Sequence, residues 1–429
     1  MRERKRKTQS TKDETSVIQK YKSYVQENIQ KLKKEFGNHA ENEELLDLSE
    51  KLDIHRNKVR KRTIVLIGLM AVLALGIAIF YRVRVFHHYK ILSQVERADD
   101  SATEYIRLSS GRTLKCNPNG VTCVNNSDVV QWNTTFNMQK PIYDVCETTV
   151  AVGDLNGSEI YLFDEKGLTG HFDVEHTLAK VKVAKQGVVA AVLEDGDVTW
   201  INVYDKNGDI IVKNKTSVGE TGYPVDMDIS SDGLKMMVSY LGVNNDNIET
   251  RVVFYNFSSV GRDQDDNMVN KVTMEGHVVP EVKFTKGNYA VAFREDGITF
   301  FYGKRVPQER TSITFEQEII SAFNNENYIG IVMPNDNQEK KAKYKLDIYR
   351  TNGTKCATQY FSMDYTGIKF ADNQVIMHNG SDIAIYTVGG KKVFQAAYEK
   401  SVTDVIKAGG LRKYVVITED STDTIRIKQ

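Results

Sequence analysis

The chain has 429 residues, of which 41% are apolar, a fraction typical of globular proteins. This length exceeds what one ordinary hydrophobic core supports, so we expect at least two structural parts. The net charge is zero, but residues 1–62 carry 17 Lys and Arg against 11 Asp and Glu, which leaves 40 against 46 for the rest. A segment of charge +6 therefore precedes a remainder of charge −6. Phosphate contacts need a basic face, so this acidic remainder argues against a nucleic acid as the partner of the main domain.

Residues 1–62 show helical periodicity. Their apolar residues recur at steps of three and four, at Val17, Ile18, Tyr21, Val25, Ile29, Leu32 and Phe36, and again at Leu45, Leu48 and Leu52. This spacing predicts one amphipathic helix and a second, shorter one. About two heptads are present where a coiled coil needs three or more, so three interpretations stay open: a coiled coil with a cytoplasmic partner, a helix on the membrane surface, and a partly ordered tail.

Residues 63–81 contain no charged side chain. At about 1.5 Å per residue, such a helix is about 28 Å long, close to the hydrocarbon thickness of a bilayer. The run begins too far from the N-terminus for a cleaved signal peptide. Six Lys and Arg lie within 15 residues before it and three within 15 residues after it, which places the N-terminus inside. We expect a single-pass protein of the plasma membrane with an extracytoplasmic C-terminal part.

These segments predict four parts: a basic helical cytoplasmic segment (1–62), a transmembrane helix (63–81), a juxtamembrane linker (82–102) and an extracytoplasmic domain (103–429). The last part alternates apolar and polar residues between frequent turn signals, which is typical of an all-β structure. The turn signals are the Asn-Gly and Asp-Gly pairs at 119–120, 156–157, 195–196, 207–208, 232–233, 296–297, 352–353 and 379–380.

The strands of residues 103–429 recur as a repeat of about 35 to 55 residues. Each repeat has three or four strands, too few to bury both faces alone, so neighbouring units must stack around a closed ring. This predicts a β-propeller. Eight units are visible, at 103–138, 141–173, 178–216, 224–259, 278–315, 318–361, 365–398 and 402–429. The last unit has only three clear strands; if the strand at 105–108 completes it, the count becomes seven. A tandem of β-sandwiches is the alternative fold.

Two stretches of the repeat carry a resemblance to known families. Leu162 to Gly167 and Val203 to Gly208 resemble blades of quinoprotein-type and WD40-type propellers. The chain as a whole is similar to a family of membrane proteins of clostridia and related Gram-positive bacteria, domain of unknown function 5711, with Gly222 to Gly233 as its most distinctive stretch. The resemblance implies the propeller and the membrane anchor. It implies no activity.

The four cysteines all lie on the predicted outer side. Cys116 and Cys123 flank a turn, so a disulfide between them and two separate thiols are both open. No zinc-binding spacing of Cys or His occurs, and no motif of a hydrolase, nucleotide-binding protein or metalloprotease stands out. We therefore predict no catalytic residue, no metal and no cofactor.

Four residues are candidates for contact with a partner. Trp132 and Trp200 either pack between blades or anchor a ligand on an exposed face. Lys340 and Lys341 lie in a long charged loop that is either a contact loop or a solvated one. The favoured function is a non-catalytic scaffold that binds a protein or an envelope polymer on a propeller face. The alternative is a propeller enzyme, such as a quinone-cofactor dehydrogenase or a glycan-cleaving enzyme, which would need metal ligands or a carboxylate pair at the central channel.

Overall fold

The computed structural model describes residues 23–30, 55, 58–74, 76, 85–97, 103–217, 219, 221–244 and 246–428. The chain divides into two compact units, Met1–Arg84 and Val85–Gln429. The first unit has helix at 23–30 and at 58–74 and 76. The helix at 23–30 confirms the central part of the predicted amphipathic helix; its remaining residues lie outside the described ones, as do those of the second predicted helix.

The predicted membrane span, 63–81, falls partly on the second of these helices. Residues 63–74 and 76 of the span are helical, while residue 75 and residues 77–81 lie outside the described part of the chain. Among the residues that the structure describes, no helix is at once long enough and apolar enough to cross a membrane.

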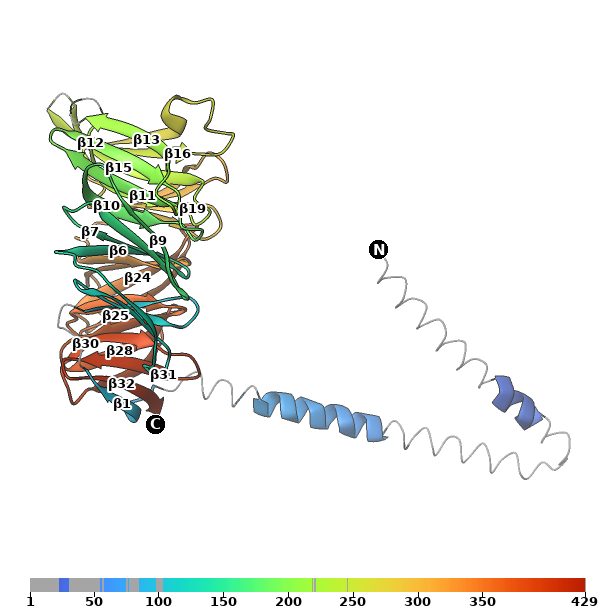
Figure 1. Ribbon diagram of the computed structural model, residues 1–429. Helices are drawn as coiled ribbons and strands as arrows, with labels where there is room; N and C mark the ends of the chain where they lie inside the picture. Colours follow the sequence, from blue (N-terminus) through green and yellow to red (C-terminus); the bar gives the residue numbers. More distant parts are fainter. Residues whose placement is uncertain are drawn as a thin grey trace, which may run out of the picture. The chain divides into compact units, whose positions relative to one another are not determined.

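The second unit is a ring of eight antiparallel four-stranded sheets, which confirms the eight-bladed propeller (Figure 1). We number the blades 1 to 8 and give their strands from the innermost outward. Blades 1 to 4 are β2(Glu104–Arg107), β3(Thr113–Asn117), β4(Gly120–Val124), β5(Val130–Thr135); β6(Pro141–Cys146), β7(Thr149–Asp154), β8(Glu159–Asp164), β9(Gly167–Asp173); β10(Thr177–Val183), β11(Val189–Asp195), β12(Val198–Tyr204), β13(Ile210–Ser217); and β14(Tyr223–Ile229), β15(Lys235–Asn244), β16(Asn247–Asn256), β17(Met268–Glu275).

Blades 5 to 8 follow the same order. They are β18(Glu281–Thr285), β19(Tyr289–Arg294), β20(Gly297–Tyr302), β21(Gln308–Thr314); β22(Ser321–Asn324), β23(Tyr328–Pro334), β24(Tyr344–Arg350), β25(Lys355–Phe361); β26(Gly367–Ala371), β27(Gln374–His378), β28(Asp382–Thr387), β29(Lys392–Ala397); and β30(Val402–Lys407), β31(Lys413–Thr418), β32(Ser421–Lys428), β1(His88–Glu96). A single turn of 3-10 helix, η1(Asp265–Asn267), lies in the connection between β16 and β17.

The ring is closed by β1, which pairs antiparallel with the last strand, β32. In Figure 1 the two strands lie side by side near the marked C-terminus. Strand β1 lies inside residues 82–102, for which the sequence predicted a linker, and β2 completes blade 1, so the seven-bladed alternative is wrong. Eight of the nine residues of β1 are exposed, because an outermost strand has solvent on most sides. It therefore shows no apolar alternation by which a strand would be predicted.

The predicted turns take the backbone geometry that their glycines allow. Gly208, between β12 and β13, has a φ of +90°, and a Cβ there would come within 2.6 Å of Phe172 of the neighbouring blade. Gly196 and Gly233 also have positive φ, at +62° and +67°. The left-handed conformation favours glycine at all three positions, and at Gly208 close packing adds to it.

Hydrophobic clusters hold neighbouring blades together. Seven clusters of buried side chains fill the seven junctions from blades 1 and 2 to blades 7 and 8. Fully buried aromatic residues such as Phe163, Phe254 and Phe300 belong to them, and each contributes roughly 1.5–3 kcal/mol to stability. Among the described residues no such cluster fills the eighth junction, between blades 8 and 1.

Candidate functional site

The order of the strands gives the propeller two different faces. The connections between successive blades and the turns between the second and third strands of each blade lie on one face, which we call the inter-blade face. Backbone hydrogen bonds join these two kinds of loop, as from Phe315 N to Asp296 O (2.8 Å) and from Tyr398 N to Ser381 O (2.7 Å). The remaining hairpin turns lie on the opposite face.

The innermost strands bring a network of charged side chains into the centre of the ring. Asp228 Oδ1 of β14 lies 3.7 Å from Lys283 Nζ of β18. Asp144 Oδ1 of β6 lies 3.6 Å from Lys182 Nζ of β10 and 4.0 Å from Lys283 Nζ. Lys283 of blade 5 thus reaches a carboxylate of blade 2, which is not its neighbour in the ring. We call Asp144, Lys182, Asp228 and Lys283 the channel network.

The channel aspartates also bind the backbone of the next innermost strand. Asp228 accepts a hydrogen bond from the N–H of Phe284 at 2.6 Å, and Asp226 accepts one from the N–H of Val282 at 3.0 Å. Asp144 accepts one from the N–H of Val183 at 2.9 Å. Each carboxylate thereby joins two blades at the axis, because its donor lies on the neighbouring blade. These aspartates act as clamps between blades 2 and 3 and between blades 4 and 5.

Burial and charge set the ionisation of this network. Burial raises the pKa of Asp228, while Lys283 and Lys182 oppose that shift. The Asp228 carboxylate in turn raises the pKa of Lys283, which stays charged. Burial also raises the pKa of Glu281, which lies two residues before Lys283 on β18. A catalytic carboxylate pair would need free oxygens, whereas the oxygens of Asp144 and Asp228 face lysines and backbone N–H groups.

The inter-blade face carries an exposed apolar pair at blade 4. Strands β15 and β16 have ten residues each, and Val243 and Ile248 face each other across this hairpin close to its tip. Val243 is 72% exposed and Ile248 is 49% exposed. Tyr223, at the start of β14, is 41% exposed, and its hydroxyl donates a hydrogen bond to Glu194 of blade 3 at 2.9 Å. We call Tyr223, Val243 and Ile248 the apolar patch.

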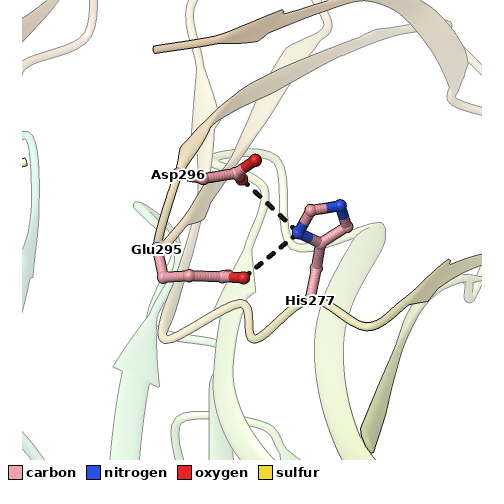
Figure 2. A group of neighbouring side chains, drawn as sticks. All are labelled: His277, Glu295 and Asp296. Atoms are coloured by element: carbon pink, nitrogen blue, oxygen red, sulfur yellow. Dashed lines mark hydrogen bonds and ion pairs between the residues drawn. The ribbon is translucent and has the colours of Figure 1, made fainter. Parts of the chain in front are cut away.

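A group of three ionisable side chains lies beside the apolar patch. His277, in the connection from blade 4 to blade 5, points its Nδ1 at Glu295 Oε1 (3.1 Å) and Asp296 Oδ1 (3.5 Å) in the β19–β20 turn, as Figure 2 shows. Their ligand atoms lie within 4.8 Å of one another, and an imidazole with two carboxylates is a donor set that divalent metals accept.

Protein groups already bind both of these carboxylates. The backbone N–H of Val278 donates to Glu295 at 2.8 Å, and Arg294 Nε donates to Asp296 at 2.9 Å. The sequence did not predict this group, because its members become neighbours only when the connection between blades 4 and 5 folds over the β19–β20 turn.

The two tryptophans pack between blades. Trp132 donates its Nε1–H to Glu165 O at 3.1 Å and stacks on Phe163 with ring centroids 5.6 Å apart. Trp200 is partly buried against the cluster between blades 2 and 3 and stacks on His176 at 5.8 Å. Neither ring belongs to the apolar patch.

Lys340 and Lys341 are exposed in the β23–β24 loop, which lies on the inter-blade face at blade 6. The amide of Asn335 donates hydrogen bonds to three carbonyl oxygens of this loop, those of Asn337, Lys340 and Ala342. These hydrogen bonds stabilise the conformation of the loop.

All four cysteines are free thiols in the structure, and Cys116 and Cys123 are buried. The β3–β4 register pairs Cys116 with Val121 and Cys123 with Leu114. Cys116 and Cys123 are therefore diagonal neighbours, which lie about 7–8 Å apart in a sheet, with their Cβ atoms somewhat closer, against about 3.5–4.5 Å between the Cβ atoms of a disulfide. Burial raises the pKa of the Cys116 thiol to about 12. Of the two open alternatives, the register favours separate thiols.

The model of a family described as "Family of unknown function (DUF5711)" matches residues 82–427. No curated protein sequence matches. Among solved structures, the chain is similar to BamB from Moraxella catarrhalis (TM-score 0.49, 9% identity, 79% of this chain and 100% of that one). It is also similar to a eukaryotic initiation factor (TM-score 0.49, 11% identity, 80% and 87%) and to the Pan2 WD40 domain of Neurospora crassa (TM-score 0.40, 10% identity, 68% and 89%).

Proposed function

The chain belongs to the family of unknown function DUF5711, and we propose that its propeller is a non-catalytic scaffold that binds a protein partner through the inter-blade face of blades 3 to 5. The observation that carries this proposal is the apolar patch. Val243 and Ile248 place two β-branched side chains in water at the tip of the longest hairpin of the ring. Exposed apolar clusters rimmed by polar residues mark protein interaction sites.

The surroundings of the apolar patch resemble the polar rim of a protein interface. The turns of the flanking blades carry acidic side chains, at Glu194 and Asp195 on blade 3 and at Glu295 and Asp296 on blade 5. Interfaces combine a desolvated apolar centre with a polar rim, and complementary charge speeds association. The partner that fits is a protein with an apolar side chain at the centre of its surface and Lys or Arg around it.

Replacing Val243 and Ile248 together by serine is expected to abolish this binding. Such anchors each contribute on the order of 2 kcal/mol or more to binding, so the double variant should bind at least tenfold more weakly. The measurement is quantitative co-purification of partners with the tagged full-length chain after crosslinking in its native cells. Leu411→Ser is the matched control, because Leu411 is 88% exposed on the opposite face. Partners captured equally by all three chains, or an envelope polymer as the only bound species, would contradict the proposal.

We further propose that residues 63–81 anchor the chain in the plasma membrane, with residues 1–62 in the cytoplasm and the propeller outside. The uncharged run and the excess of Lys and Arg before it support this arrangement. The full-length chain is expected to stay in the membrane fraction at alkaline pH, and external protease should remove the propeller from intact spheroplasts. Release of the chain by alkali, or protection of the propeller until lysis, would contradict the anchor or its orientation.

A further inference from the structure

The junction between blades 8 and 1 differs from the other seven. Among the described residues it has no cluster of buried apolar side chains, and a pocket of about 40 Å³ lies there instead. A single buried water needs roughly 10–15 Å³, so the pocket has room for a group of several atoms. Its walls come from both ends of the propeller chain: β1, β30, β31 and β32 of blade 8, and β2, β3 and the β4–β5 turn of blade 1.

The polar groups of this pocket leave one positive charge unbalanced. Arg107, on β2, is half-buried, and its guanidinium donates to Thr113 Oγ1 at 3.0 Å and to Asn126 Oδ1 at 2.6 Å. Both acceptors are neutral, and within the described part of the chain no carboxylate forms an ion pair with Arg107. Burial accordingly lowers the pKa of this guanidinium. A guanidinium has five N–H donors, and these two hydrogen bonds use two of them.

The other charged residues of the pocket balance each other. Lys115 Nζ lies 3.1 Å from Asp128 Oδ1. Among the described residues that line the pocket, Asp128 is the one acidic side chain, and it is already paired with Lys115. The lining thus carries a net charge of +1, from Arg107. A partly desolvated cation without a counter-charge costs free energy, and an anion in the pocket removes that cost.

We propose that the pocket between blades 8 and 1 binds a small oxyanion, a carboxylate or phosphate group, through the guanidinium of Arg107. Arginine forms paired N–H bonds to such groups, because its planar fork matches two oxygens of one anion. Thr422 and Thr424 of β32 and Asn125 of the β4–β5 turn supply neutral hydrogen-bonding groups around the same space. The volume suits the charged group itself and not a whole nucleotide.

The pocket lies at the junction where the ring closes, so anion binding should stabilise that closure. The blade 8 wall includes β1, the strand that closes the propeller, while Arg107 belongs to blade 1. An anion bound here contacts both sides of the junction that lacks an apolar core. A species that binds only the folded protein raises the free energy of unfolding by RT ln(1 + L/Kd), where L is its free concentration, so binding in the pocket should be visible as resistance to unfolding.

The experiment is thermal unfolding of the purified full-length chain, titrated with sodium phosphate, sodium sulfate or sodium acetate against sodium chloride at equal ionic strength. We expect Tm to rise with the logarithm of the phosphate or acetate concentration once this exceeds Kd, and to stay constant with chloride. A response to acetate assigns the pocket to carboxylates; a response to phosphate and sulfate without acetate assigns it to tetrahedral anions.

Three variants decide the proposal. Arg107→Gln should weaken the anion response at least tenfold, Arg107→Lys should keep part of it, and Arg350→Gln, at an exposed arginine of blade 6, should leave it unchanged. Isothermal titration of phosphate and acetate into the same chains provides a readout that does not depend on unfolding. An equal response of Arg107→Gln and the natural chain would overturn the proposal, as would the absence of both a rise in Tm and a calorimetric binding isotherm of the natural chain with each of the three anions.

Discussion

Replacing Lys283 by methionine is expected to lower the free energy of unfolding by about 3 kcal/mol, because it leaves the buried Asp228 carboxylate without the cation that pairs with it. Lys283 Nζ lies between Asp228 and Asp144, and its side chain is only 23% exposed. The measurement is urea unfolding of the propeller, followed by tryptophan fluorescence and circular dichroism.

A lower pH should reduce the loss in free energy of unfolding that Lys283→Met causes. Burial raises the pKa of Asp228, so the folded state takes up a proton at a higher pH than the unfolded chain does. Falling pH therefore favours the folded state at this group, and loss of Lys283 enlarges the effect. We expect the deficit of Lys283→Met to be smaller at pH 5 than at pH 8.

A second substitution separates charge from packing. Asp228→Asn retains an acceptor for the Phe284 N–H while removing the charge, so the pair Lys283→Met and Asp228→Asn should recover part of the lost stability. Lys185→Met is the matched control, since Lys185 is 56% exposed, its partner Glu147 is 45% exposed, and such a pair contributes about 1 kcal/mol or less. A deficit for Lys283→Met no larger than that of Lys185→Met would show that the channel network does not stabilise the ring.

Removing strand β1 is expected to have a larger effect still. A fragment of residues 103–429 lacks the outermost strand of blade 8 and exposes the edge of β32. It also loses Phe86, which is buried in the cluster between blades 7 and 8, and the stacking of Tyr89 on Tyr398. These losses lower the free energy of unfolding by roughly 5 kcal/mol or more, which is comparable with the whole net stability of many domains. The exposed edge of β32 can also pair with another chain and so promotes aggregation.

Size-exclusion chromatography and thermal unfolding of two fragments, 85–429 and 103–429, test this expectation. The longer fragment should be monomeric with a single cooperative transition, and the shorter one should aggregate or unfold at a much lower temperature. Equal behaviour of the two fragments would mean that β1 does not close the ring.

The fold could be predicted because propeller blades repeat. The repeat spacing and the turn dipeptides are sufficient to predict eight units, since the second and third strands of every blade carry buried residues. Strand β1 was missed because its exposed side chains, such as Lys90 and Gln94, follow no apolar pattern. Its role depends on pairing with β32, more than 300 residues away in the chain, which no local signal reports.

The candidate sites were less predictable than the fold. Asp226 and Asp228 lie in the distinctive stretch from Gly222 to Gly233, and their alternation with apolar residues could have marked one face of a strand as charged. Their partner Lys283 comes from the next blade, so the network required the ring. Packing between blades was one of the two interpretations of the tryptophans in the sequence, and their ring contacts agree with it. Val243 and Ile248 look in sequence like ordinary strand residues.

The central claim is that the inter-blade face of blades 3 to 5 binds a protein. The most direct measurement places a photo-crosslinking amino acid at Val243 in one full-length chain and at Leu411 in another, and illuminates the native cells that produce them. Both positions are exposed, at 72% and 88%, and they lie on opposite faces. We predict a discrete crosslinked protein from position 243 and none from position 411. Crosslinks of equal yield from both positions, or from position 411 alone, would contradict the account.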